Sequence, residues 1–147
     1  MATRATIAIQ NEDFTVNSIY THWDGYPSHM GTMMLNHYNT RKKVEKLISM
    51  GNASSINETI GEKHDFNGER PKNQCVFYER DRGDQNQEAK YHPNLRHYIE
   101  GRAQDGEYCY VFTKRGWYYG KITGSVVMLE KLTKSACKKE GKTIDAY

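Results

Sequence analysis

The sequence contains no apolar run approaching the ~20 residues that a membrane span needs. Its N-terminal residues also lack the apolar stretch of a secretory signal peptide. Cysteine is scarce: the three cysteines are odd in number, and none stands in a C-x-x-C pair, so neither a disulfide framework nor a zinc knuckle is indicated. We therefore expect a cytoplasmic protein that does not contact a membrane.

An excess of charge of one sign is also missing. The 21 lysine and arginine residues nearly balance the 18 acidic residues, and a net charge of +3 is too small for many contacts to duplex DNA. Hydrophobic residues make up only 37%, but eleven tyrosines and two tryptophans supply large surfaces for burial. The 147 residues suit one domain that spans the whole chain, 1–147.

Several catalytic and cofactor motifs are absent. The chain has no G-x-x-x-x-G-K-[ST] loop, no G-x-G-x-x-G loop and no G-x-S-x-G elbow, which argues against common nucleotide-hydrolysing, dinucleotide-binding and hydrolase folds. His29 and His37 are eight residues apart, too far to share one metal ion on a helix. We expect neither a metal nor a cofactor.

Alternation of apolar and polar residues predicts two β-hairpins. The first pairs residues 5–10 with residues 16–21, and Phe14 stands in its turn where a glycine is expected. The second pairs residues 107–112 with residues 117–122. Because both connections are short, each pair is expected to be antiparallel.

Apolar residues at helical spacing predict the helices. The expected helical segments are residues 27–39 with a methionine-rich core face, the stretch from the cap Thr40 to Gly51, a short turn at 55–58, residues 93–100, and residues 126–139 with Gly141 as their stop. Together with the hairpins, they predict an α+β fold in which an antiparallel β-sheet of hairpins is covered by helices on one face.

The most informative segment is His22-Trp23-Asp24-Gly25-Tyr26, at the junction of an expected strand and a helix that begins at Pro27. Side chains at such a junction are held by rigid elements and remain open to solvent, which suits binding. A structural interpretation also stays open. In that case Trp23 and Tyr26 belong to the core, and Asp24 caps the helix.

A second candidate segment follows the expected buried strand at residues 75–78. Arg80 and Arg82 flank Asp81 in a stretch without one apolar residue, which predicts a loop. Guanidinium groups match phosphate oxygens, so this loop is suited to bind an anion. It is equally open that Arg82 pairs with Asp81 or Asp84 on a solvated turn.

These segments carry a resemblance to a family of small proteins encoded by tailed bacteriophages and prophages. The chain is similar to that family over about residues 4–120, at residues 22–26, Gly31, 35–39, 60–64, 77–78 and the Arg-Asp-Arg-Gly stretch at 80–83. The resemblance implies a phage origin, and it implies no particular activity.

The candidate residues together suit a small phosphorylated nucleotide. The expected ligand-binding residues are His22, Trp23, Asp24, Tyr26, His64, Tyr78, Arg80 and Arg82. The aromatic rings can stack on a base, and the arginines can bind phosphate. The remaining side chains can form hydrogen bonds with a base edge or a ribose hydroxyl.

We therefore expect a phage counter-defence protein that sequesters a nucleotide-type immune signal, without cleaving it, in the cytoplasm of the bacterial host. Two alternatives stay open. The protein inhibits a host or defence protein by binding it directly, or it is a metal-independent phosphodiesterase with His22 and His64 as acid and base.

We also expect a homodimer or a higher homo-oligomer. The aromatic strands at residues 108–112 and 117–119 carry apolar side chains on both faces. If helices covered one face, the other would be free to meet a second copy.

Overall fold

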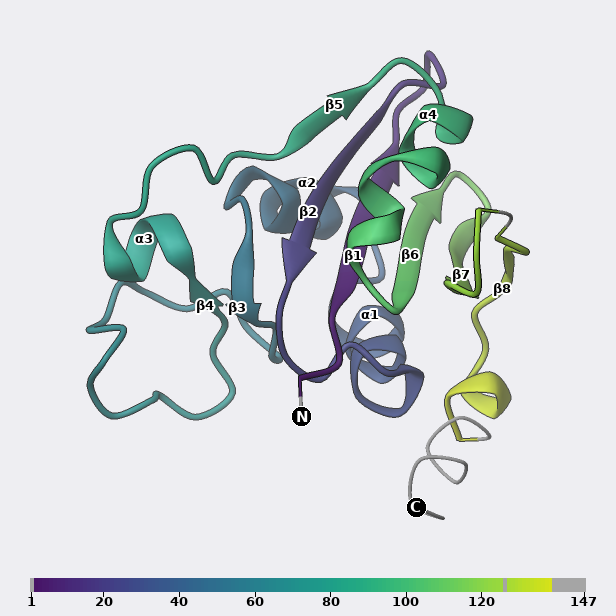
Figure 1. The fold of residues 1–147 in the computed structure, drawn as a ribbon. Helices are drawn as coiled ribbons and strands as arrows, with labels where there is room; N and C mark the ends of the chain where they lie inside the picture. The colour runs from purple at the N-terminus through teal and green to yellow at the C-terminus, as the bar shows by residue number, and fades with distance from the viewer. Residues whose placement is uncertain (1, 126, 139–147) are drawn as a thin grey trace.

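One mixed β-sheet runs through residues 2–125 and 127–138, which the computed structural model describes (Figure 1). The neighbouring strands follow the order β4-β3-β2-β1-β6-β7-β8, and β5 also pairs with β2. The strands are β1 (Ala5–Gln10), β2 (Val16–Thr21), β3 (Ala53–Ser55), β4 (Val76–Phe77), β5 (Lys90–His92), β6 (Tyr108–Thr113), β7 (Gly116–Lys121) and β8 (Glu130–Lys131).

The helices lie between the strands, which confirms the α+β class. They are the π-helix η1 (Pro27–Gly31), which continues into α1 (Thr32–His37), then α2 (Arg41–Ser49), α3 (Tyr78–Arg82), α4 (Leu95–Glu100) and the 3-10 helix η2 (Arg102–Asp105). The chain is helical again at residues 134–138. Within the described ranges, no helix has the length and apolar character that a membrane crossing requires.

Both predicted hairpins are confirmed, because β1 pairs with β2 and β6 with β7 in antiparallel registers. The sheet is nevertheless mixed, and the prediction of a purely antiparallel sheet is wrong. Strand β1 runs parallel to β6, with Ala5 opposite Tyr108, and β2 runs parallel to β3, with Thr21 opposite Ala53. Parallel neighbours need crossover connections, and the long segments with helices between these strands provide them.

Helices cover both faces of the sheet, where one covered face was predicted. Alternation along β1 places Ile7 in the main core, which also contains Leu47 of α2. The same alternation places Ala8 in a second cluster with Tyr98 of α4 and Ala103 of η2. Figure 1 shows α4 in front of the sheet and α1 and α2 behind it. The apolar stripe of a short helix shows that the helix packs against a core, but it does not indicate which face of the sheet the helix covers.

The aromatic residues expected at a subunit interface are buried inside the chain, apart from the half-buried Tyr118. Tyr110 is 0% exposed, and its hydroxyl donates to the carbonyl of Gly25 at 2.6 Å. Trp117 is 3% exposed, and its indole N–H donates to the carbonyl of Tyr38 at 2.8 Å. The surface argument for a homodimer therefore loses its basis, and the oligomeric state stays a prediction.

The turn of the first hairpin closes through Phe14, which has a φ of 68°. Its backbone N–H donates to the carbonyl of Asn11 at 2.9 Å, and the N–H of Asn11 donates to the carbonyl of Thr15 at 2.8 Å. This left-handed conformation favours glycine, which explains why a glycine was expected there.

Two local predictions are wrong around β3 and β4. Residues 55–58 do not begin a helical turn, because Ser55 ends strand β3. A loop was expected after the buried strand, but the structure has helix α3 there. The helix ends at Gly83, which has a φ of 80°. Glutamate and arginine have high helix propensity, and a left-handed glycine is the usual end of a helix.

The helix predicted for residues 126–139 is wrong in its first half. Strand β8 pairs there with β7, and Leu129 and Leu132 pack into different clusters on opposite faces of the sheet. Such alternation is a strand pattern, although the same apolar residues also fit helical spacing. Val126, Lys139 and Gly141 lie outside the described residues.

The buried His92 joins β5 to its surroundings. His92 is 3% exposed, its Nε2 lies 2.9 Å from the hydroxyl of Ser18, and its Nδ1 lies 3.0 Å from Nδ1 of His97. Burial lowers the pKa of His92 from its ordinary value of 6.5, and the nearby positive groups His97, Arg102 and Lys90 lower that pKa further.

We expect the free energy of unfolding to fall between about pH 7.5 and about pH 5.5. The unfolded chain binds a proton at His92 more readily than the folded chain, so lowering the pH through the ordinary histidine range favours unfolding. Urea denaturation at both pH values measures this fall in the free energy of unfolding. The fall should be smaller in the His92→Gln variant. An unchanged pH dependence in that variant would assign the effect to another group.

Candidate functional site

Strand β2 leads into the His-Trp-Asp-Gly-Tyr motif, which continues the pairing with β3. The backbone N–H of His22 donates to the carbonyl of Ala53 at 3.2 Å, and that of Trp23 donates to the carbonyl of Ser54 at 3.0 Å. The backbone is therefore fixed by the sheet, while the Trp23 side chain remains 45% exposed. This is the arrangement expected of a binding residue at a strand end.

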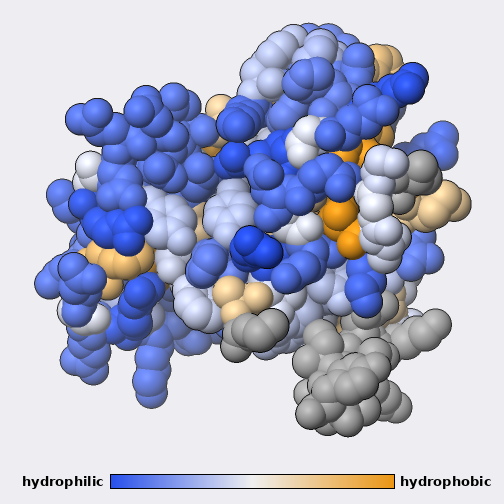
Figure 2. Space-filling view, viewed as in Figure 1, coloured by the Kyte–Doolittle hydropathy of each residue, from blue (hydrophilic) through white to orange (hydrophobic). Residues whose placement is uncertain are grey.

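A hollow of about 470 Å³ opens beside these residues, a size within the usual range of small-molecule sites. It is lined by Tyr20, His22, Trp23, Ser54, Phe66, Arg70, Tyr78, Arg82, Asp84 and Gln87. Four predicted residues are thus brought together, namely His22, Trp23, Tyr78 and Arg82. The face in Figure 2 is largely hydrophilic, with small apolar groups of atoms at the left, near α3, and right of the centre, near β6 and β7.

One wall of the hollow combines aromatic rings with guanidinium groups. The rings of Phe66 and Tyr78 lie 5.8 Å apart between centroids. Arg82 lies over both rings, with its Cζ 4.5 Å from the centroid of Phe66 and 4.8 Å from that of Tyr78. Arg70 lies over Phe66 at 4.8 Å. Two positive groups are therefore held against flat apolar surfaces.

The other wall is formed by the end of β2. The hydroxyl of Tyr20 lies 2.7 Å from Nδ1 of His22, and burial raises the pKa of Tyr20, which keeps the phenol protonated. This contact occupies Nδ1 of His22 and leaves Nε2 to hydrogen-bond a ligand. Trp23 meets the His22 ring edge-on at 5.0 Å.

Arg80 does not face the hollow, although it was predicted to bind phosphate. Its guanidinium donates to the carboxylate of Asp81 from Nε at 2.9 Å and from Nη2 at 3.1 Å. It also donates to the carbonyls of Ile60, Gly61 and Cys75. With these acceptors, Arg80 holds the connection between β3 and β4 in place.

His64 is likewise placed behind the hollow. Its backbone N–H donates to the Asp81 carboxylate at 3.1 Å, and its Nδ1 lies 2.9 Å from the side-chain amide of Gln74. Burial acts to raise the pKa of Asp81, but hydrogen bonds from Arg80, Phe77 and His64 outweigh it and hold that pKa below its usual value. Asp81 therefore stays a carboxylate that anchors this segment.

Asp24 and Tyr26 do not line the hollow. Asp24 has a φ of 58° and accepts a hydrogen bond from the hydroxyl of Tyr26 at 3.2 Å. Helix η1 begins without a side-chain cap, so the interpretation of Asp24 as its cap is wrong. Gly25 sets the turn, because a Cβ at this position would lie 2.6 Å from the Cβ of Ala5.

Asn52 positions two lining residues from behind. Its Oδ1 accepts from the backbone N–H of Tyr20 at 2.9 Å and from Nη2 of Arg102 at 2.6 Å. Its Nδ2 donates to Oε1 of Gln87 at 3.1 Å. One amide thus joins β2 to the segment after α3.

The sequence interpretation missed several lining residues, including Tyr20, Phe66, Arg70 and Asp84. Tyr20 precedes His22 by two residues on a strand, and side chains with that spacing share a face. Phe66 is the lone aromatic residue of a polar stretch, which is also a usable signal. Nothing in the local sequence distinguishes Arg70 from other surface arginines.

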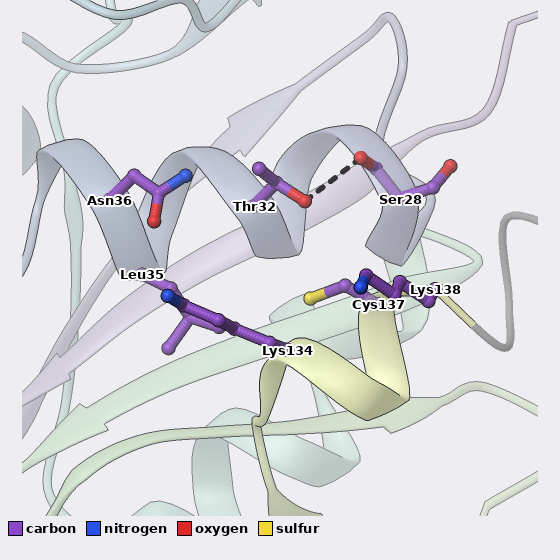
Figure 3. A pocket seen from close by; sticks show the side chains of 7 residues that line it. All are labelled: Ser28, Thr32, Leu35, Asn36, Lys134, Cys137 and Lys138. Atoms are coloured by element: carbon purple, nitrogen blue, oxygen red, sulfur yellow. Dashed lines mark hydrogen bonds between the residues drawn. The ribbon is translucent and has the colours of Figure 1, made fainter.

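A second hollow of about 290 Å³ lies between η1 with α1 and the helical residues 134–138 (Figure 3). Hydroxyl and amide side chains of Ser28, Thr32 and Asn36 face Lys134 and Lys138 across it. Its lining, as far as residue 138, offers no aromatic face. Among the residues that the structure describes, no group of three or more histidine, cysteine, aspartate or glutamate side chains could hold a metal ion, and all three cysteines are buried and free.

No protein-family model, curated protein or solved structure matches the chain. The similarity to phage proteins therefore remains an expectation from the residues that carry it. The function has to be argued from the hollow and its lining.

We expect the two arginines of α3 to differ in their effect on stability. Arg80→Ala leaves the buried carboxylate of Asp81 without its counter-charge and should lower the free energy of unfolding by about 3 kcal/mol. Arg82→Ala removes an exposed pair and should leave stability close to that of the wild type. Urea denaturation of both variants tests this, and equal losses would contradict the assignment of Arg80 to the fold.

Proposed function

We propose that the protein binds a small phosphorylated nucleotide in the hollow beside β2 and holds it without cleaving it. The observation that carries the proposal is the meeting of exposed aromatic faces with two guanidinium groups in one hollow. A base needs a flat π-surface, and a phosphate needs a positive group with several N–H donors.

The base is proposed to stack against Trp23, which is exposed and whose backbone is fixed by the sheet. On the opposite wall, the rings of Tyr78 and Phe66 support the guanidinium groups of Arg70 and Arg82. Nε2 of His22 supplies a hydrogen-bonding group for a base edge. These contacts recognise an aromatic, polar ligand rather than a purely apolar one.

The phosphate is proposed to bind Arg70 and Arg82. Arg70 has no carboxylate partner within salt-bridge distance among residues 2–125 and 127–138, so its donors are available to a ligand. Arg80 is left out of the proposal because protein acceptors already surround its guanidinium.

Binding without cleavage is favoured over phosphodiesterase activity by the placement of the histidines. General acid–base catalysis needs two groups within reach of one reacting centre. His22 lines the hollow, whereas His64 lies against Asp81 and Gln74 behind it. The pair proposed for catalysis therefore does not face a common ligand.

The biological role is proposed from the phage origin that the resemblance implies, together with the lining of the hollow. We propose counter-defence by sequestration of a nucleotide-type immune signal in the cytoplasm of the bacterial host. Direct inhibition of a host or defence protein is the alternative. It would use the same exposed Trp23 as a contact and would need no small ligand.

One experiment separates these functions. The purified protein is incubated with cyclic and ADP-ribose-type nucleotides, separated from free ligand and denatured, and the released material is analysed. Intact ligand in stoichiometric amount supports sequestration. Altered ligand supports an enzyme, and the absence of bound ligand supports a protein target.

Trp23→Ala is expected to weaken binding of the recovered nucleotide by about 1–3 kcal/mol, the usual contribution of one stacked base. Calorimetry measures the loss. Tyr91→Ala is the matched control, because Tyr91 is 64% exposed on β5 and does not line the hollow. Equal affinities of Trp23→Ala and the wild type would remove Trp23 from the site.

A further inference from the structure

Arg82 already binds an anion of the protein itself. Its Nε lies 3.0 Å and 3.1 Å from the two carboxylate oxygens of Asp84, and its Nη2 lies 2.6 Å from Oδ2. A carboxylate in this position presents two oxygens to the guanidinium edge, as a phosphate group does. Both residues line the hollow.

The position of the Arg82 guanidinium does not depend on Asp84 alone. The rings of Phe66 and Tyr78 lie under it, with centroid distances of 4.5 Å and 4.8 Å. These rings would keep the guanidinium in place after the carboxylate has left. An anion-binding position thus exists on Arg82 and is filled by Asp84.

The side chain of Asp84 is not needed to close the turn after α3. Its backbone N–H donates to the carbonyl of Tyr78 at 3.1 Å, and the N–H of Gly83 donates to the carbonyl of Glu79 at 2.9 Å. The turn is therefore held by the main chain. The Asp84 carboxylate therefore has no role in closing this turn.

We propose that the Asp84 carboxylate competes with the phosphate of the ligand for Arg82 and so sets the affinity of the hollow for anions. The inference deepens the proposed function and rests on it in one respect, that the ligand carries a phosphate. The Arg82 and Asp84 side chains are 44% and 29% exposed, so water screens the pair and an incoming phosphate can displace the carboxylate.

The competition lowers the affinity for every anion by a similar factor. A free anion such as pyrophosphate gains only its contacts to the guanidinium groups, so it binds weakly. A nucleotide also stacks on the rings, and this additional free energy offsets the displacement of Asp84. The hollow can therefore retain nucleotides while abundant free phosphates leave it mostly empty.

The test measures pyrophosphate binding by calorimetry at low ionic strength. Asp84→Asn keeps the shape of the side chain and should bind pyrophosphate about five- to tenfold more tightly than the wild type. The gain should vanish when Arg82→Gln is added. Glu79→Gln is the matched control, because it removes an exposed carboxylate of α3, the helix that carries Arg82, and Glu79 is in no ion pair with Arg82 among the described residues.

The proposal is overturned if the wild type and Asp84→Asn bind pyrophosphate equally, if neither binds it, or if the gain persists without Arg82. A gain of the same size in Glu79→Gln would also overturn it, because general repulsion would then account for the effect.

Titrations with ADP-ribose and a cyclic dinucleotide distinguish this inference from the proposed function. If neither protein binds a nucleotide but Asp84→Asn gains pyrophosphate binding, the proposed function fails and the role of Asp84 stands. If the wild type and Asp84→Asn bind nucleotides with equal affinity, the role of Asp84 fails and the proposed function stands. Tighter binding of both probes by Asp84→Asn supports both.

Discussion

The candidate site depends on one buried carboxylate. The Asp81 side chain is 0% exposed and accepts hydrogen bonds from the main chain of Phe77 and His64 and from the guanidinium of Arg80. These donors belong to the end of β4, to the connection between β3 and β4, and to α3. A single acceptor thus fixes the connection that carries Phe66 against the helix that carries Tyr78.

Two arginines of α3 have opposite roles because of helix geometry. Residues two positions apart on a helix point to nearly opposite sides. Arg80 points to the connection and binds Asp81 and three carbonyls, whereas Arg82 points to the rings of the hollow. Their identical chemistry in a stretch without apolar residues gave no sign of this division, since the helix was not predicted.

Local patterns account for the correct predictions. The alternation in β1, β2, β6 and β7 defines both hairpins, and Thr40 caps α2 by accepting from the backbone N–H of Lys43. The motif at residues 22–26 was recognised because polar and aromatic side chains follow a strand. The parallel pairing of β1 with β6 and the approach of Phe66 to Tyr78 join distant parts of the chain, and no short window of sequence specifies them.

The outer edge of β2 is divided between two partners, and this division creates a seam in the sheet. Strand β5 pairs with residues Val16 to Ser18, whereas β3 pairs with Thr21 and, beyond the end of β2, with the backbone of His22 and Trp23. Between these two strands, the backbone N–H of Tyr20 donates a hydrogen bond to the side chain of Asn52 instead of to a neighbouring strand. Local opening costs least where few hydrogen bonds cross, so amide exchange at Tyr20 reports when the β3–β4–α3 unit separates from the main sheet. Such an opening would move one wall of the hollow as a unit and expose Ala53 and Phe77 of the main core, while the second cluster around Ala8 and Tyr98 would stay closed.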